Sequence, residues 1–480
     1  MLAAWVVEEM KTVELNDRRL NERLITLLDQ LAAKPTASIP AACGGGGAEV
    51  MAAYRFFDND KATYEGIMQP HLEATRLRMA EQQVVLLVQD TTELDLTRPE
   101  KQVQGAGLLD GNARRGLLSH VLHAFTPDGT PLGTVQSEPW TRDDDAVTSN
   151  SLSRAERAAT PIEEKESHRW VVAMQHAQEE ARRASATTFI CVGDSEADIY
   201  ELFAQGAADP QMQWLVRGCQ NRAVQKDEET AENYVKERVL SQPVLFTQKI
   251  NVRGRTAQVA CETRGRRQPR KSRETEVAVR AASVTLRPPR RPDRKLPPVT
   301  VNVVAVAEVN PPADDEPVEW ILITTLPIAD VEQVREIIQY YVVRWMIEIF
   351  FRVLKGGCRV EGRRFEHVDR LLTCLAIYMI VAWRTLFVCR MGRSCPDIDC
   401  QAIFEPAEWK SVWKVVHRTD PPRTPPSLGE MVRMVAQLGG YVNRKRDDAP
   451  GPQTVWLGLQ RMHDMALCWE LFGPDSRQDE

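Results

Sequence analysis

One helix-forming segment constrains the fold of this 480-residue chain more than any other. Residues 340–355, YYVVRWMIEIFFRVLK, are apolar at most positions. An α-helix turns by about 100° per residue, so the polar side chains from Tyr341 onward fall within an arc of about 80°. They are Tyr341, Arg344, Glu348, Arg352 and Lys355. So narrow a polar face predicts a helix buried nearly all round, whose charges face polar partners because unpaired buried charges are costly.

A solvent-exposed stripe is the alternative interpretation. Arg344 and Glu348 are four residues apart, the spacing of a surface ion pair that contributes a few tenths of a kcal/mol to a helix. Two acidic residues elsewhere in the chain favour a functional site instead.

Asp90 and Asp194 each follow an apolar run of strand type, VVLLV and TTFICVG, and we expect the first strand to end at Asp90. Ligand sites form where adjacent central strands end. Two strand carboxylates and Glu348 can hold two divalent cations about 3.5–4 Å apart, an arrangement that supports phosphodiester displacement. Such oxygen ligands suit Mg²⁺. Taken singly, each Asp is better explained as a helix cap or turn residue than as a catalytic group.

Charge is distributed unevenly along the chain. The formal net charge is −6, yet residues 253–295 hold fourteen Arg or Lys against four acids. A local basic footprint is what phosphate binding requires. A solvated linker rich in Arg and Pro is the alternative.

The pattern along the chain predicts a helical unit, then an α/β region, then a second helical region. Ten scattered cysteines are typical of reduced thiols, and no uncharged apolar run reaches the roughly 18 residues of a membrane span. We therefore expect a soluble cytoplasmic protein with no membrane partner.

Several motifs together resemble one known family. They are LNDRRLNERL, AAYRFFDN, VQDTTELDL, EKESHRW, VGDSEADIYELF and the spacing Y-x2-R-x3-E-x6-K from Tyr341 to Lys355. Over nearly its whole length the chain is similar to the DDE cut-and-paste transposases of the bacterial insertion-sequence-four family. The resemblance implies an RNase H-like α/β core, a mixed β-sheet flanked by helices, at residues 73–372 with a β-rich basic insertion at about 235–300. It also implies a helical DNA-end-binding domain at 1–72 and a helical dimerisation region at 373–480.

The resemblance further implies an enzyme. Asp90, Asp194 and Glu348 would be catalytic metal ligands for two Mg²⁺ ions, with Mn²⁺ able to substitute. A homodimer would bind the terminal inverted repeats of its insertion sequence and cut them, through a hairpin, before joining the 3′-hydroxyls to target DNA. It would act in the bacterial cytoplasm, on the nucleoid.

The resemblance also implies DNA contacts. Tyr341, Arg344 and Lys355 would bind phosphates of the strand end, and Trp320, otherwise a core aromatic, would stack on a displaced base. Further expected contacts, for which surface ion pairs or solubility are the alternatives, are Arg217, Arg222, Arg363 and Arg364 near the cut end and Arg18, Arg19, Arg23, Tyr54 and Arg55 in the N-terminal unit.

Two other functions remain open on the sequence: a transposase-derived DNA-binding regulator or inhibitor without strand transfer, and a stand-alone metal-dependent nuclease. The first needs no metal ligands. The second would cut DNA that lacks the element's ends.

Overall fold

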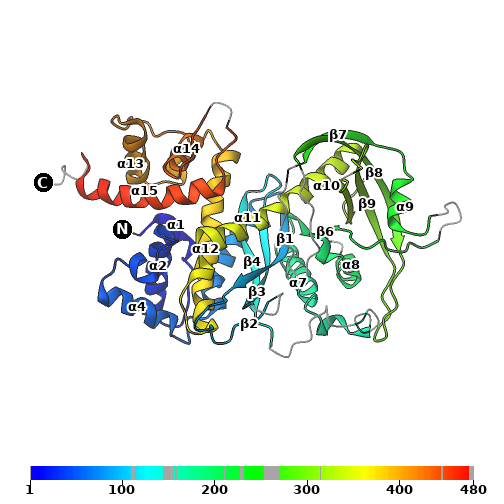
Figure 1. The fold of residues 1–480 in the computed structure, drawn as a ribbon, viewed down its shortest axis with the longest axis horizontal. Coiled ribbons are helices and arrows are strands. Elements are labelled where there is room, and N and C mark those ends of the chain that lie inside the picture. Colours follow the sequence, from blue (N-terminus) through cyan, green and yellow to red (C-terminus); the bar gives the residue numbers. More distant parts are fainter. Residues whose placement is uncertain are drawn as a thin grey trace.

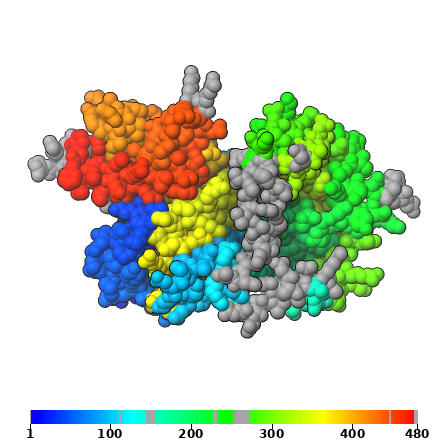
Figure 2. All heavy atoms as spheres, viewed as in Figure 1, coloured from blue at the N-terminus to red at the C-terminus, as the bar shows by residue number. Residues whose placement is uncertain are grey.

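The computed structural model describes residues 2–109, 114–143, 153, 156, 159–209, 211–226, 232–252, 254, 271–313, 315–444 and 447–474. A β-sheet with helices on both faces lies between two groups of helices at one end and a strand-rich extension at the other (Figure 1). On the face drawn in Figure 2, the N-terminal segment (blue) and the C-terminal segment (orange to red) adjoin.

The N-terminal unit is helical, as the leucine spacing predicts. Its helices are α1 (Ala4–Glu9), α2 (Arg18–Ala33), α3 (Ile39–Ala42), α4 (Gly47–Phe57) and α5 (Tyr64–Ala80). The apolar face of α2 is fully buried at Leu24, Leu27, Leu28 and Leu31. Helix α5 continues through position 72, where the sequence suggests a domain boundary, and carries the chain directly to the sheet.

The sheet described by the structure has ten strands in the order β2-β3-β1-β5-β6-β10-β9-β8-β7, with β4 paired to β3. Strands β1, β5 and β6 pair in parallel, and the other described pairs are antiparallel. The bounds are β1 Val84–Asp95, β2 Gly107–Leu108, β3 Arg115–Phe125, β4 Pro131–Trp140, β5 Thr188–Gly193, β6 Met212–Arg217, β7 Phe246–Val252, β8 Arg273–Leu286, β9 Val299–Glu308 and β10 Glu319–Thr324. The insertion strands therefore extend the core sheet; the basic residues at 253 and 255–270 lie outside the described part.

The two faces of the sheet follow the alternation of side chains along each strand. Val85 and Leu87 of β1 pack in the cluster that includes residues of α7 (His168–Arg183) and α8 (Tyr200–Ala207). Leu86 and Val88 pack in the cluster formed with α10 (Val331–Val343), α11 (Trp345–Arg352) and α12 (Val368–Ser394). A short helix, α9 (Val235–Leu240), packs against β8 and β9. The predicted mixed sheet flanked by helices is confirmed.

Helix α12 joins the parts of the molecule. It contacts α2, α5, β4 and the C-terminal helices α14 (Leu428–Leu438) and α15 (Pro452–Phe472), beside which α13 (Pro406–His417) packs. By length and composition α12 is also apolar enough to cross a membrane, but 83% of its most apolar window is buried inside the protein. Its apolar surface is covered by its own chain, as in the central helix of a folded core.

Candidate active site

Strand register brings Asp90 and Asp194 to the same edge of the sheet. The parallel pairing of β1 with β5 ends at Val88 opposite Val192, and each aspartate lies two residues further on. Two residues is one strand repeat, so Asp90 points to the face of Val88, which is the face that α11 covers. The expectation that the first strand ends at Asp90 was wrong. Strand β1 continues to Asp95 because β3 pairs with it along that whole length.

Asp194 stands at the end of β5 and begins a short 3₁₀-helix, Ser195–Ala197. Its Oδ1 accepts a hydrogen bond of 2.7 Å from the backbone N–H of Glu196. The side chain therefore does cap a helix, as the alternative reading of a lone Asp proposed. Capping engages Oδ1 and is compatible with a second role for the carboxylate.

The segment at 340–355 is not one continuous helix. Helix α10 ends at Val343, and Arg344 links it to α11, which runs from Trp345 to Arg352. A π-helical turn follows at 353–357. Val342 and Trp345 are 54% and 46% exposed, so burial nearly all round was also wrong. A π-helical turn of this kind is frequent at functional sites, and here it carries Lys355.

The predicted polar stripe nevertheless faces one cavity. This cavity of about 790 Å³ brings together residues from β1, the β5 end, β6, α10, α11 and the π-helical turn. Its lining residues are Asp90, Thr91, Thr92, Asp194, Ser195, Glu196, Arg217, Tyr341, Arg344, Trp345, Glu348, Phe351, Arg352 and Lys355. The three predicted metal ligands and all five residues of the polar stripe, which include Glu348, thus share one site.

Several lining residues were not predicted as site candidates, among them Glu196 and Trp345. Glu196 follows Asp194 by two positions in GDSEAD, and that second acid was the available signal. Trp345 was assigned to the apolar face, because periodicity alone does not reveal where a helix borders a cavity.

Opposite charges are closely arranged in the cavity. Arg344 Nη2 lies 2.5 Å from Oε1 of Glu348, and Arg344 Nη1 lies 3.4 Å from Oδ2 of Asp90. Burial, and then the nearby Asp194 carboxylate, raise the pKa of Asp90 to about 7, although Arg344 acts in the opposite direction. Burial lowers the pKa of Lys355, opposed by Glu361. The site therefore concentrates carboxylates that an added cation would stabilise.

The carboxylates of the cavity suit a divalent metal by their chemistry, but their side chains are not grouped around one point. Carboxylate oxygens are the ligands that Mg²⁺ and Mn²⁺ take in such sites. Among the described residues, however, no three His, Cys, Asp or Glu side chains are grouped closely enough to hold an ion. Arg344 instead contacts both Asp90 and Glu348.

The remaining candidates near the cavity differ in their surroundings. Trp320 packs edge-on against Tyr341 with ring centroids 5.6 Å apart, and Arg217 lines the cavity. Arg222 is bound to the buried Asp198 at 2.6 Å. Arg363 is buried and donates to the carbonyls of Pro35, Ala37 and Cys358, whereas Arg364 is exposed. Arg222 and Arg363 thus already have structural partners.

The N-terminal candidates lie on α2 and α4. Arg18 and Arg19 are almost fully exposed, and Tyr54 and Arg55 are exposed on α4. Arg23 binds Glu49 of α4 at 2.6 Å, which fixes α2 against α4. No comparison or contact tests their roles, which stay predictions.

Three family models match this chain in succession. They are described as transposase DNA-binding (residues 2–62), transposase DDE domain (residues 132–383) and transposase Tn5 dimerisation domain (residues 380–468). The DDE match includes Asp194 and Glu348 and begins after Asp90. The dimerisation match agrees with the resemblance to the insertion-sequence-four family.

Among solved structures, the chain is similar to one described as a cryo-EM structure of the piggyBac transposase synaptic complex with hairpin DNA. The identity is 8%, the TM-score is 0.35, and the alignment covers 99% of this chain and 80% of that one.

A transposase DDE domain carries metal-dependent chemistry, and here it is accompanied by a DNA-binding domain and a dimerisation domain. Because the DDE match alone spans more than half of the sequence, the protein belongs to the DDE transposases, as an enzyme of the Tn5-like type.

Proposed function

We propose that this DDE transposase mobilises an insertion sequence in the bacterial cytoplasm. It binds the terminal inverted repeats as a homodimer, cuts each end through a hairpin intermediate and joins the freed 3′-hydroxyls to target DNA. The observation that carries the proposal is the shared cavity of Asp90, Asp194 and Glu348 with Tyr341, Arg344 and Lys355. Carboxylates for metal ions and basic groups for phosphates are together what phosphodiester displacement requires.

Asp90, Asp194 and Glu348 would hold two Mg²⁺ ions, or Mn²⁺ in their place. Ions held there would activate the attacking hydroxyl and stabilise the leaving oxygen. One site can then perform each step, since hydrolysis, hairpin formation, hairpin opening and strand joining differ only in the nucleophile.

Protein groups around the carboxylates would hold the DNA end. Lys355 and Arg344 would bind phosphate oxygens, and Tyr341 would donate a hydrogen bond to the same strand. Trp320, whose ring packs edge-on against Tyr341, would stack on a base displaced by the hairpin. Arg217 and Arg364 would contact the backbone nearby, and Arg222 and Arg363 would act mainly by fixing the loops that carry such contacts.

Each of the three predicted domains would have its own role in transposition. Residues 1–72 would recognise the end, through Arg18, Arg19, Arg23, Tyr54 and Arg55. Residues 73–372 would carry out catalysis, with the insertion at about 235–300 adding phosphate contacts, and 373–480 would join two subunits.

An excision assay tests the proposal. A marker is placed between the sequences that flank this gene, and the protein is supplied as wild type or as Asp194→Ala. We expect loss of the marker and its reinsertion elsewhere only with the wild type. Specific end binding without excision by either protein would instead indicate the regulator, and cutting of DNA without the ends and without joining would indicate a stand-alone nuclease.

A further inference from the structure

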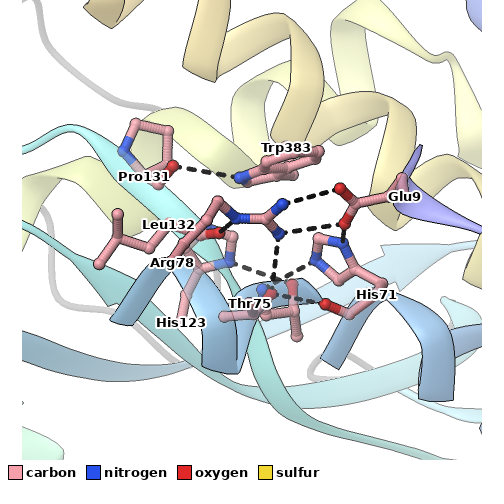
Figure 3. A network of polar contacts seen from close by, with 9 residues as sticks. Glu9, His71, Thr75, Arg78, His123, Pro131, Leu132 and Trp383 are labelled. Carbon is pink, nitrogen blue, oxygen red and sulfur yellow. Dashed lines mark hydrogen bonds and ion pairs between the residues drawn. The ribbon is translucent and has the colours of Figure 1, made fainter. Parts of the chain in front are cut away.

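A buried charged cluster lies where the N-terminal unit meets the catalytic core (Figure 3). Glu9 ends α1, and its side chain is only 4% exposed. Arg78 of α5 binds both of its oxygens, Nη1 to Oε2 at 2.8 Å and Nη2 to Oε1 at 3.0 Å. The same guanidinium donates from Nε to the Leu132 carbonyl at 2.6 Å and lies 4.2 Å from the ring centre of Trp383 on α12. We call Glu9, His71 and Arg78 the Glu9 cluster.

The protonation of His71 follows from its hydrogen bonds. The ring is fully buried, and its Nε2 accepts from the backbone N–H of Thr134 on β4 at 2.9 Å. An accepting Nε2 carries no proton, so Nδ1 carries it and donates to Glu9 Oε1. Burial also lowers the pKa of His71. The cluster therefore holds one anion, one cation and one neutral histidine, each in a fixed orientation.

Contacts continue from the Glu9 cluster to the catalytic helix. Thr134 Oγ1 lies 3.1 Å from Nδ1 of His123 on β3. The His123 ring in turn lies against Phe350 of α11, with ring centroids 4.6 Å apart. Phe350 is two residues beyond Glu348. An unbroken series of contacts thus joins the end of α1 to the helix that carries a predicted metal ligand.

A buried ion pair is weak evidence of stabilisation, because apolar residues of similar volume often serve as well. What such a pair can supply is a defined geometry, since its hydrogen bonds form in one arrangement only. Within the same helix, Arg76 forms a comparable pair with the buried Glu180 of α7, at 2.7 Å, inside the core. Among the residues that the structure describes, that pair makes no polar contact with α1 or α11, so it provides a matched comparison.

We propose that Glu9 and His71 are positioning residues that fix the DNA-binding unit, residues 2–62, relative to α11 and the catalytic cavity. DNA held by that unit would then reach the cavity in one register. This inference rests on the proposed role of Glu348. It predicts that breaking the Glu9 cluster loosens α11 and slows the cutting of bound DNA, while the binding of that DNA persists.

Hydrogen exchange of the full-length protein tests the link without any DNA. We expect Glu9→Gln to speed exchange of the amides of α11 at least threefold and to leave α7 unchanged. The matched variant Glu180→Gln should do the reverse. Thr134→Val, which keeps the backbone donor and removes only the hydroxyl, breaks the series at its middle and should also loosen α11, so the test survives if Glu9→Gln fails to fold. Unchanged α11 exchange in Glu9→Gln or, if that protein does not fold, in Thr134→Val would overturn the proposal.

A cleavage measurement separates positioning from binding. With a duplex carrying the DNA that flanks the gene, Glu9→Gln should bind within threefold of the wild type, and its cleavage rate at saturating DNA should fall at least tenfold. Equal losses of affinity and rate would contradict positioning. A wild type that binds but does not cut would refute the proposed function, and the exchange result would still decide whether the link exists.

Discussion

Arg344 contacts two of the four carboxylates that line the candidate catalytic cavity, with Nη2 2.5 Å from Glu348 Oε1 and Nη1 3.4 Å from Asp90 Oδ2. Its side chain is only 11% exposed. A guanidinium in this position compensates the carboxylates in the free protein. A metal ion held by Asp90 and Glu348 would compete with that guanidinium, and Arg344 would then be available for a phosphate.

Removing this guanidinium should strengthen metal binding. Because one competing cation is lost from the ligands themselves, we expect Arg344→Gln to raise the affinity for Mn²⁺ about tenfold, or about 1.4 kcal/mol, without DNA. Electron paramagnetic resonance of free Mn²⁺ measures this directly. Arg352→Gln, an exposed residue of the same cavity wall, controls for the general charge change and should gain less than threefold. Equal gains in both variants would contradict direct competition.

The salt dependence of DNA binding tests a hollow that is lined by basic residues of the insertion. Arg287 and Arg290 are exposed and line a hollow of about 600 Å³ together with Arg222. If both contact phosphates, the double change to Gln should reduce the slope of log K against log[salt] by about 1.8, since each contact contributes about 0.9. Fluorescence titration of an end duplex at several salt concentrations gives this slope. Arg423→Gln, an exposed arginine of the C-terminal region, should leave it unchanged, and an unaltered slope in the double variant would exclude the contact.

Trp320 provides a test of the hairpin step. Stacking on a base contributes about 1–3 kcal/mol, so Trp320→Ala should slow hairpin formation on a pre-nicked duplex by roughly 10- to 100-fold. Trp320→Phe keeps an aromatic face and should retain most of the rate. Denaturing gels resolve the hairpin from the nicked strand. Identical rates in the alanine and phenylalanine variants would show that stacking is not involved.

The side chain of Glu408 on α13 should contribute to the pH dependence of the free energy of unfolding. Burial raises its pKa to about 7, against the opposing effects of the Glu405 backbone and Arg384. Since the folded pKa exceeds the ordinary glutamate value of 4.5, the folded chain keeps the proton to a higher pH than the unfolded chain. Its contribution is therefore complete below pH 4.5 and is lost as the pH rises through about 7.

Glu408→Gln imitates the protonated form and keeps an oxygen for the Glu405 N–H. Relative to the wild type, its free energy of unfolding should increase by about 1–3 kcal/mol between pH 5 and pH 8, as measured by urea denaturation. Glu430→Gln, an exposed acid in the first turn of α14, serves as the control. A difference that does not vary with pH would refute the assignment.

Much of the site follows from periodicity and strand order. The apolar runs of β1 and β5 and the helical spacing of Tyr341, Arg344 and Glu348 are local features of the chain, which a sequence pattern reports directly. Resemblance supplied the fold family, and the DDE match confirms it.

Other features depend on partners distant in the chain. The extension of β1 past Asp90 requires pairing with β3, and the Glu9 cluster joins residues 62 and 69 positions apart. The sequence also does not show the internal partners of two predicted DNA contacts, Asp198 for Arg222 and backbone carbonyls for Arg363. Long-range polar pairs leave no periodic signal.

The most direct measurement of the central claim is cleavage of a duplex bearing the DNA that flanks the gene, with Mg²⁺, by the wild type and by Glu348→Gln, together with the affinity of each for that duplex. The account predicts that Glu348→Gln binds within threefold of the wild type and cuts at least 10³-fold more slowly, the order expected when a metal ligand is lost. Cleavage by Glu348→Gln at the rate of the wild type would contradict the account, because the carboxylate cavity would then not be the site of the chemistry.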